Sequence, residues 1–164
     1  MLSFRRSHLG LMLILLTVVI YQVRGPLASH AQSPSQRTIE SDAAEVEAAG
    51  KWQKQAATQA SGGSYLYSSG DEADALTLVF EGTTVVVTYI AGPKLGTIAL
   101  EVDDTVLRTV ITAADQTHYG ESTTLNYLTN ETHTLKVYAQ EGGVIAVDSF
   151  VISTLTPPPT TPRA

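Results

Sequence analysis

The chain has 164 residues, a formal net charge of −6 and no cysteine. This length accommodates one domain of about 100 to 150 residues with short appendages, so a second full domain is not expected. The absence of cysteine excludes disulfides, thiolate metal sites and cysteine nucleophiles. The negative charge argues against nucleic acid and anionic membrane surfaces as partners, because such binding draws on Lys and Arg side chains that neutralise phosphates.

The N-terminal segment is typical of an export signal. Two arginines precede an apolar run over residues 9–21. Thirteen helical residues span about 20 Å, less than the roughly 30 Å of a bilayer core, which favours a signal peptide over a membrane-spanning anchor. Ser29-His30-Ala31 places small residues before a candidate cleavage at Gln32. We expect residues 1–31 to be a hydrophobic helical signal peptide or, alternatively, a retained membrane anchor.

The remaining chain is expected outside the cell or at its surface. Residues 1–31 contain three arginines and no carboxylate, so removal of this segment changes the net charge from −6 to −9. An exported domain without disulfides indicates a bacterial source, since secreted animal domains often use such bridges. Contact with the membrane is expected only through the N-terminal segment.

Residues 37–153 are predicted to form an all-β domain. Leu76, Leu78 and Phe80 alternate with their neighbours, as in a strand with one buried face, whereas 85–90 is almost continuously apolar, as in a strand buried on both faces. Such runs recur about every ten residues, which predicts an antiparallel β-sandwich or barrel. The eight or nine predicted strands are 37–40, 64–68, 75–80, 85–90, 98–102, 106–111, 124–128, 134–139 and 144–152.

One segment, Glu40 to Ala60, permits two interpretations. It is rich in good helix formers, and Ser41-Asp42 could cap a short helix. The alternative is extended chain at 45–46 and 52–57, which the resemblance described below favours.

Two polar segments flank the predicted domain. Residues 32–36 are expected to be a linker, and 154–164 form a Pro/Thr-rich tail that holds four of the seven prolines. Because proline lacks a backbone donor, this tail is not expected to join a sheet. It is similar to the linkers that tether modules on cell surfaces.

Seven landmarks follow one another along the chain. They are Gly50-Lys51-Trp52, Ser61-Gly62-Gly63-Ser64-Tyr65, Leu78-Val79-Phe80-Glu81-Gly82-Thr83, Gly92-Pro93-Lys94-Leu95-Gly96, Glu101-Val102-Asp103-Asp104, His133-Thr134-Leu135-Lys136-Val137 and Val147-Asp148-Ser149-Phe150. Their order resembles the galactose-binding-like jelly rolls of carbohydrate-binding modules and of many bacterial surface proteins. The resemblance covers 37–153 and implies ligand binding, commonly of glycans; it does not imply catalysis.

Aromatic and amide side chains are the candidate ligand contacts, because aromatic rings stack on sugar faces and amides bond sugar hydroxyls. For each there is a structural alternative: a core position for the tryptophan, a half-buried position for paired tyrosines and ordinary loop chemistry for the rest. The candidates are Trp52, Tyr65, Tyr67, Tyr119, Asn126 and Tyr127.

A structural calcium is the one cofactor that the resemblance implies. Related modules hold calcium with a Glu on the first strand and an Asp on the last, and Glu40 and Asp148 occupy matching places. The first strand departs from the usual pair of glutamates around an alanine, so backbone carbonyls would have to supply most of the six to eight oxygens. The alternative for Asp148 is hydrogen bonding to backbone groups.

The remaining polar residues give no catalytic pattern. Asp103-Asp104 is expected to be a turn, because adjacent strand residues project to opposite faces. His118 is expected in a loop and His133 near a strand start, bonded to a turn, and no nucleophile elbow occurs. We expect a non-catalytic binding module that recognises a polysaccharide or other glycan. The alternatives are a structural or protein-interaction domain that binds another surface protein, and a hydrolase with an unrecognised site.

Overall fold

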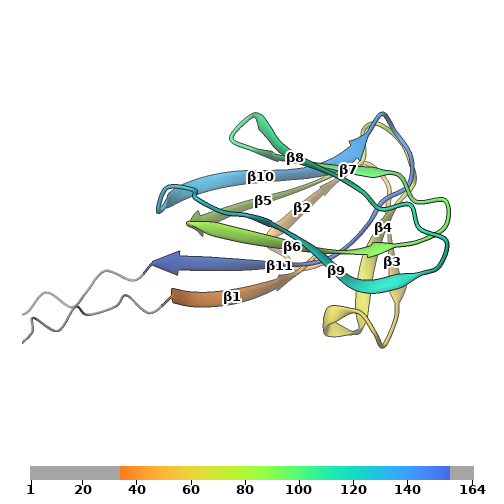
Figure 1. Ribbon diagram of the computed structural model, residues 1–164, viewed down its shortest axis with the longest axis horizontal. Helices are drawn as coiled ribbons and strands as arrows, with labels where there is room; N and C mark the ends of the chain where they lie inside the picture. Colours follow the sequence, from red (N-terminus) through yellow and green to blue (C-terminus); the bar gives the residue numbers. More distant parts are fainter. Residues whose placement is uncertain (1–33, 156–164) are drawn as a thin grey trace, which may run out of the picture. The chain divides into compact units, whose positions relative to one another are not determined.

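The computed structural model describes residues 34–155, which form two antiparallel β-sheets packed as a sandwich (Figure 1). The first sheet, sheet A, has the strand order β3-β4-β11-β6-β9, and β1 pairs with β11 on the edge that β4 also uses. The second, sheet B, has the order β2-β5-β10-β7-β8. The strands are β1 (Pro34–Glu40), β2 (Val46–Ala49), β3 (Trp52–Ala56), β4 (Ser64–Ser68), β5 (Ala75–Gly82), β6 (Thr84–Ala91), β7 (Thr97–Val102), β8 (Thr105–Ile111), β9 (His118–Leu125), β10 (Glu131–Gln140) and β11 (Ala146–Leu155).

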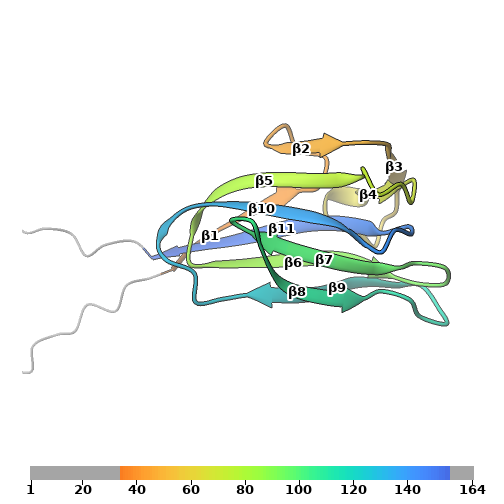
Figure 2. The ribbon, with the colours of Figure 1, turned by 90° about the horizontal axis from the view of Figure 1, so that it is seen from above.

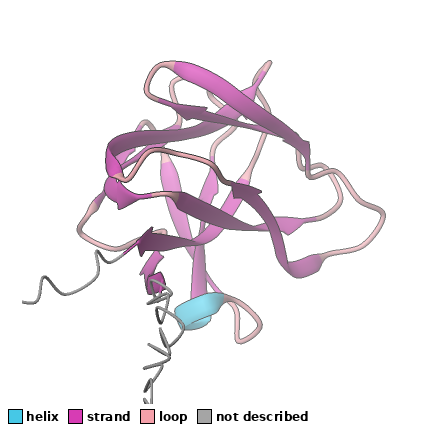
Figure 3. Cartoon of the chain, turned by 60° about the vertical axis from the view of Figure 1, so that its left-hand side comes forward, coloured by secondary structure: helices cyan, strands magenta, loops and turns pink. Residues whose placement is uncertain are grey.

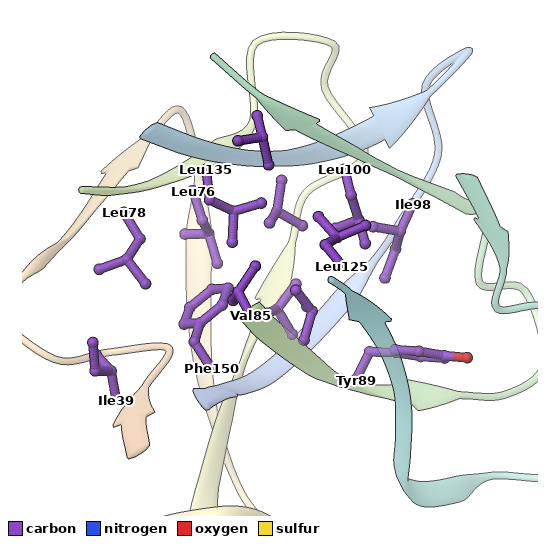
Figure 4. Close-up of a cluster of buried hydrophobic side chains, with 14 of the residues drawn as sticks. Ile39, Leu76, Leu78, Val85, Tyr89, Ile98, Leu100, Leu125, Leu135 and Phe150 are labelled. Atoms are coloured by element: carbon purple, nitrogen blue, oxygen red, sulfur yellow. The ribbon is translucent and has the colours of Figure 1, made fainter. Parts of the chain in front are cut away.

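Alternating side chains from both sheets form one hydrophobic core. In β10, Leu135 and Val137 are fully buried while the residues between them face solvent, and β5 follows the same pattern. Phe150 of β11 lies at the centre, with Leu76, Leu78 and Val85 around it (Figure 4). Burying a side chain of this size contributes about 1.5–3 kcal/mol. The core therefore holds the domain together without disulfides.

Both ends of the described chain leave from the same end of sheet A. Pro34 of β1 pairs with Leu155 of β11, whereas Ala146, at the start of β11, pairs with Tyr67 of β4 at the far end (Figure 2). We call these the terminal end and the distal end of the sandwich. Among the described residues no helix is long and apolar enough to cross a membrane.

The predicted β-sandwich is confirmed, but it has more strands than expected. The segment Glu40 to Ala60 is extended and supplies β2 and β3, which confirms the alternative that the resemblance favoured. The only helical element in the described part is a 3₁₀ turn at Ser61–Gly63 (Figure 3). Strand pairing also begins at Pro34 and ends at Leu155, a few residues beyond each predicted bound. The expected N-terminal helix and most of the tail lie outside the described residues.

The strand predicted at 124–128 was wrong in position. β9 spans His118–Leu125 and is polar and largely exposed. It is held by backbone pairing with β6 at the edge of sheet A, which requires no apolar side chains. His118, expected in a loop, begins this strand.

The turn at Asp103-Asp104 is confirmed. Both residues have positive φ, 50° and 63°, and they join β7 to β8. Asp103 Oδ2 lies 2.6 Å from Nδ1 of buried His133, whose Nε2 lies 2.9 Å from the Thr129 carbonyl oxygen. Since both ring nitrogens face acceptors, the charged imidazolium fits this position, and the bond to Asp103 raises the pKa of His133.

Candidate functional site

Two tyrosines of β4 lie on the outer face of sheet A. Leu66 and Ser68 are buried toward the core, and the period of two places Tyr65 and Tyr67 on the opposite face. Tyr67 is 37% exposed and Tyr65 is half-buried. The predicted pair is therefore partly open to solvent.

Tyr119 joins this pair from the other edge of the sheet. Its ring meets that of Tyr65 edge to face, with centroids 6.2 Å apart and planes at 69°. Ile90 of β6, which belongs to the same sheet, is only 2% exposed and lines the adjoining hollow with Tyr65 and Tyr67. We call Tyr65, Tyr67, Tyr119 and this hollow the tyrosine site.

The hollow has a volume of about 140 Å³ and lies at the distal end. Backbone bonds hold its far wall, because Gly92 N–H donates to the Thr112 carbonyl and Leu95 N–H donates to the Gly92 carbonyl. The site is thus built on paired strands and a hydrogen-bonded loop. The residues that line the hollow are Tyr65, Tyr67, Ile90, Gly92, Pro93, Leu95, Thr117 and Ala146.

The Tyr65 hydroxyl is a neutral hydrogen-bonding group. Burial raises the pKa of Tyr65 above its ordinary value of 10, and the neighbouring Tyr119 and Tyr67 raise it further. The phenol therefore stays protonated at neutral pH and can both donate and accept a hydrogen bond.

The other predicted ligand residues lie elsewhere. Trp52 packs partly buried against the core, and its Nε1–H donates to the Ala49 carbonyl at 2.9 Å. Asn126 and Tyr127 follow β9 at the terminal end, where Leu128 N–H donates to the Thr83 carbonyl. Tyr127 has a φ of 64° and is 95% exposed. The structure brings together three of the six predicted residues and separates the other three.

Several residues of the site were not predicted. Ile90 and Ala146 gave no signal, because an apolar or small residue in a strand is ordinary. Thr117 lies just before β9 in a polar segment, where a threonine is equally ordinary. Pro93 and Leu95 lie within the Gly92–Gly96 landmark, whose two glycines mark a turn but do not reveal what it contacts.

A second cluster lies where β1, β11 and the 3₁₀ turn meet. Ser61 Oγ donates to Glu40 Oε1 at 2.8 Å, and Ser61 N–H donates to Asp148 Oδ2 at 3.1 Å. The other two oxygens, Glu40 Oε2 and Asp148 Oδ1, are buried without a hydrogen-bond partner. Burial raises the pKa of Asp148, as does the nearby Glu40 carboxylate, and the bond from Ser61 only partly offsets this. We call Glu40 and Asp148 the carboxylate pair.

The carboxylate pair fits part of a calcium site. Two unpartnered carboxylate oxygens are the hard ligands that Ca²⁺ prefers, and buried carboxylates without partners are costly. No group of three or more His, Asp or Glu side chains that could hold a metal occurs in residues 34–155. Asp42, the next carboxylate after Glu40 in the chain, forms an ion pair with Lys54.

A larger hollow of about 250 Å³ lies on sheet B, near the exposed edge strand β8. Its lining contains no aromatic ring within the described part of the chain, so it offers no stacking surface. The lining residues are Thr97, Thr109, Ile111, Gln140 and Glu141.

Comparison with known proteins establishes the fold. No family model matches the sequence, and no curated protein matches it. A family two carbohydrate esterase from Cellvibrio japonicus has a TM-score of 0.57 at 14% identity, over 80% of this chain and 38% of that one. A two-domain esterase active on acetylated mannans, co-crystallised with mannopentaose, gives 0.53 at 16% identity, over 74% and 37%. An exo-β-1,3-galactanase from Phanerochaete chrysosporium gives 0.51 at 15% identity, over 72% and 29%.

These likenesses confirm the β-sandwich fold that the resemblance predicted. The chain spans about a third of the length of the enzymes that it matches. The likeness is therefore to one part of each enzyme.

Proposed function

We propose that this protein is a non-catalytic module that binds carbohydrate through the tyrosine site. The observation that carries the proposal is the edge-to-face pair Tyr65–Tyr119, which with Tyr67 flanks a hollow on a solvent-facing sheet. Such rings offer apolar faces for the C–H groups of a sugar and hydroxyls for its polar groups. The hollow is smaller than the roughly 300 Å³ of pockets that enclose drug-sized ligands, which favours shallow contact with one or two sugar rings.

The chemistry of the site favours binding over catalysis. Glycoside hydrolysis needs two carboxyl groups that flank the scissile bond. No carboxylate of the described residues lines the hollow. The known proteins with this fold named above act on carbohydrates, and the chain corresponds to only part of each, as a binding module would.

We also propose an extracellular or cell-surface location, most simply in a bacterium. The basic and apolar start of the sequence supports export. The geometry adds that the tyrosine site lies at the distal end, away from the point where both flanking segments depart. A module tethered by either segment would present its site outward.

The test is retention of the full chain by immobilised polysaccharides, with Tyr65→Ala and Tyr127→Ala as a matched pair. Tyr65→Ala should weaken binding at least roughly tenfold, since losing an aromatic stack on a ring costs on the order of 1–3 kcal/mol. Tyr127→Ala removes an exposed tyrosine at the terminal end and should leave binding unchanged. Equal loss in both variants, or no retention on any polysaccharide, refutes the proposal.

A protein-interaction role is the second candidate, and the edge strand β8 favours it. Val106, Leu107 and Ile111 of β8 are 49%, 47% and 75% exposed. Exposed apolar side chains on an edge strand are typical of protein contacts. Under this alternative Ile111→Lys would abolish capture of the partner, while Tyr65→Ala would not.

We further propose that the carboxylate pair holds a structural calcium ion. Glu40 Oε2 and Asp148 Oδ1 would supply ligands, together with backbone carbonyls. The ion would neutralise two buried carboxylates and fix the 3₁₀ turn that leads into β4, the strand that carries Tyr65 and Tyr67.

A further inference from the structure

The lining of the tyrosine site carries no charge. Its side chains are tyrosines, aliphatic residues, a proline and a threonine, and no Lys, Arg or His from residues 34–155 lines the hollow. Its polar groups are the hydroxyls of Tyr65, Tyr67 and Thr117 with the local backbone. Such groups bond the hydroxyls of a sugar but cannot neutralise a carboxylate or sulfate.

The rest of the domain is strongly acidic. All 16 carboxylates of the chain lie within residues 34–155, against six Lys and Arg. An anionic polymer would approach a surface of its own sign, which slows association. At the site its charge would lose water without gaining a partner, which costs free energy.

The charged groups nearest in sequence to the lining do not alter this balance. Lys94 stands between Pro93 and Leu95 but is not one of the lining residues, and it is exposed, with a φ of 67°. His118 and Glu121 flank Tyr119 on β9 and are also exposed. Asp115 and Asp148, each two residues from a lining residue, add only negative charge. Lys94 is the one Lys or Arg of residues 34–155 within two residues of the lining, so no anion site is built there.

We propose that the tyrosine site selects neutral glycans and excludes those built of uronic acids or sulfated sugars. This inference rests on the proposed function and narrows its ligand class. It assigns the selectivity to the uncharged lining rather than to any single residue.

The experiment compares polymers that share a backbone and differ only in charge. Hydroxyethyl cellulose is paired with carboxymethyl cellulose, and methyl-esterified polygalacturonate with polygalacturonate, beside neutral xylan, mannan and galactan. Affinity electrophoresis of the full chain measures retardation by each. We expect every retained polymer to be neutral, with any charged counterpart bound at least roughly tenfold more weakly, because like-charge juxtaposition is costly.

Two variants test whether the uncharged lining causes the selectivity for neutral glycans. Thr117→Lys places a cation on the lining and should increase affinity for the anionic member of a pair about two- to fivefold at low salt, the size of an exposed ion pair. Lys94→Gln removes the neighbouring cation and should change nothing.

The experiment distinguishes failure of the neutral selectivity from failure of the proposed carbohydrate binding. Preferential binding of the anionic polymers that is lost in Tyr65→Ala and Lys94→Gln overturns the neutral selectivity but leaves the proposed function standing. Retention by no polymer at all refutes both.

Discussion

Two aspartates, Asp74 and Asp148, are equally buried in this domain, each 1% exposed, yet their surroundings are opposite. Asp74 accepts hydrogen bonds from the backbone N–H groups of Lys51 at 2.6 Å, Ser69 at 2.8 Å and Asp71 at 3.2 Å, and from Ser69 Oγ at 2.7 Å. Burial works to raise its pKa, but these four bonds outweigh burial and lower it. Asp74 is therefore stable as an anion.

Asp148 has a single partner, the N–H of Ser61, and one oxygen with none. Burial and the neighbouring Glu40 raise its pKa. The difference teaches that burial alone does not identify a functional carboxylate. Asp74 ties the loop before β5 to the start of β3, and nothing remains for it to bind, whereas the carboxylate pair has oxygens left for a cation or a proton.

The largest expected effect separates the two aspartates directly. Asp74→Asn turns an amide toward N–H donors and should lower the free energy of unfolding by about 2–4 kcal/mol. In chelator, Asp148→Asn should cost less than about 1 kcal/mol or stabilise, because it removes repulsion from Glu40. Urea unfolding measures both. Equal losses of unfolding free energy in the two variants would contradict this difference between Asp74 and Asp148.

Calcium should act on the carboxylate pair alone. A ligand that binds only the folded state at 100 times its Kd adds about 2.7 kcal/mol, so Ca²⁺ should raise the Tm by several degrees over EDTA. The gain should vanish in Asp148→Asn. If chelation leaves the Tm unchanged, the calcium proposal is wrong, and the carboxylate pair shares a proton instead.

The pH dependence should have opposite signs at the two aspartates. In chelator, Asp148 holds its proton more tightly in the folded than in the unfolded state, so its contribution is full below the unfolded pKa of 3.8 and is lost as pH rises through the raised folded pKa. Asp74 contributes stability above 3.8 that is lost as pH falls through its lowered pKa.

The free energy of unfolding of Asp148→Asn, subtracted from that of wild type at each pH, isolates the contribution of Asp148 to stability. The slope of this difference against pH cannot exceed about 1.4 kcal/mol per pH unit for one proton. A difference that is flat with pH from 4 to 7 would show that Asp148 does not titrate there. The Tm gain from Ca²⁺ should also shrink at acid pH, since protons compete with the metal.

The smallest effect compares two glycines beside the carboxylate pair. Gly62 and Gly63 have φ of 58° and 83°, so either change to Ala should cost about 1 kcal/mol. A Cβ on residue 62 would lie 2.9 Å from Glu40 Cδ, whereas nothing lies within 4 Å of one on residue 63. Only Gly62→Ala should reduce the Tm gain from Ca²⁺, because only that change displaces Glu40. The same reduction in both variants would place the ion elsewhere.

The sequence predicted more of the fold than of the site. Alternation at Leu76, Leu78 and Phe80 is a local consequence of a half-buried strand, so it is visible without a structure. β9 was misplaced because an edge strand of polar residues has no apolar period. Tyr119 was predicted as a candidate ligand contact with ordinary loop chemistry as the alternative, but its place on β9, which brings its ring against Tyr65, was not predicted.

The sequence by itself determined an acidic, cysteine-free all-β domain, and its strand spacing and landmark order predicted the β-sandwich. It also singled out eight candidate site residues, which are Trp52, Tyr65, Tyr67, Tyr119, Asn126, Tyr127, Glu40 and Asp148. Only the tertiary structure separated Tyr127 and Trp52 from the tyrosine site, and it alone distinguished the satisfied Asp74 from the unsatisfied Asp148. Which residues meet across a sheet, and whether a buried oxygen finds a partner, depend on contacts between strands far apart in the chain, and local composition does not encode them.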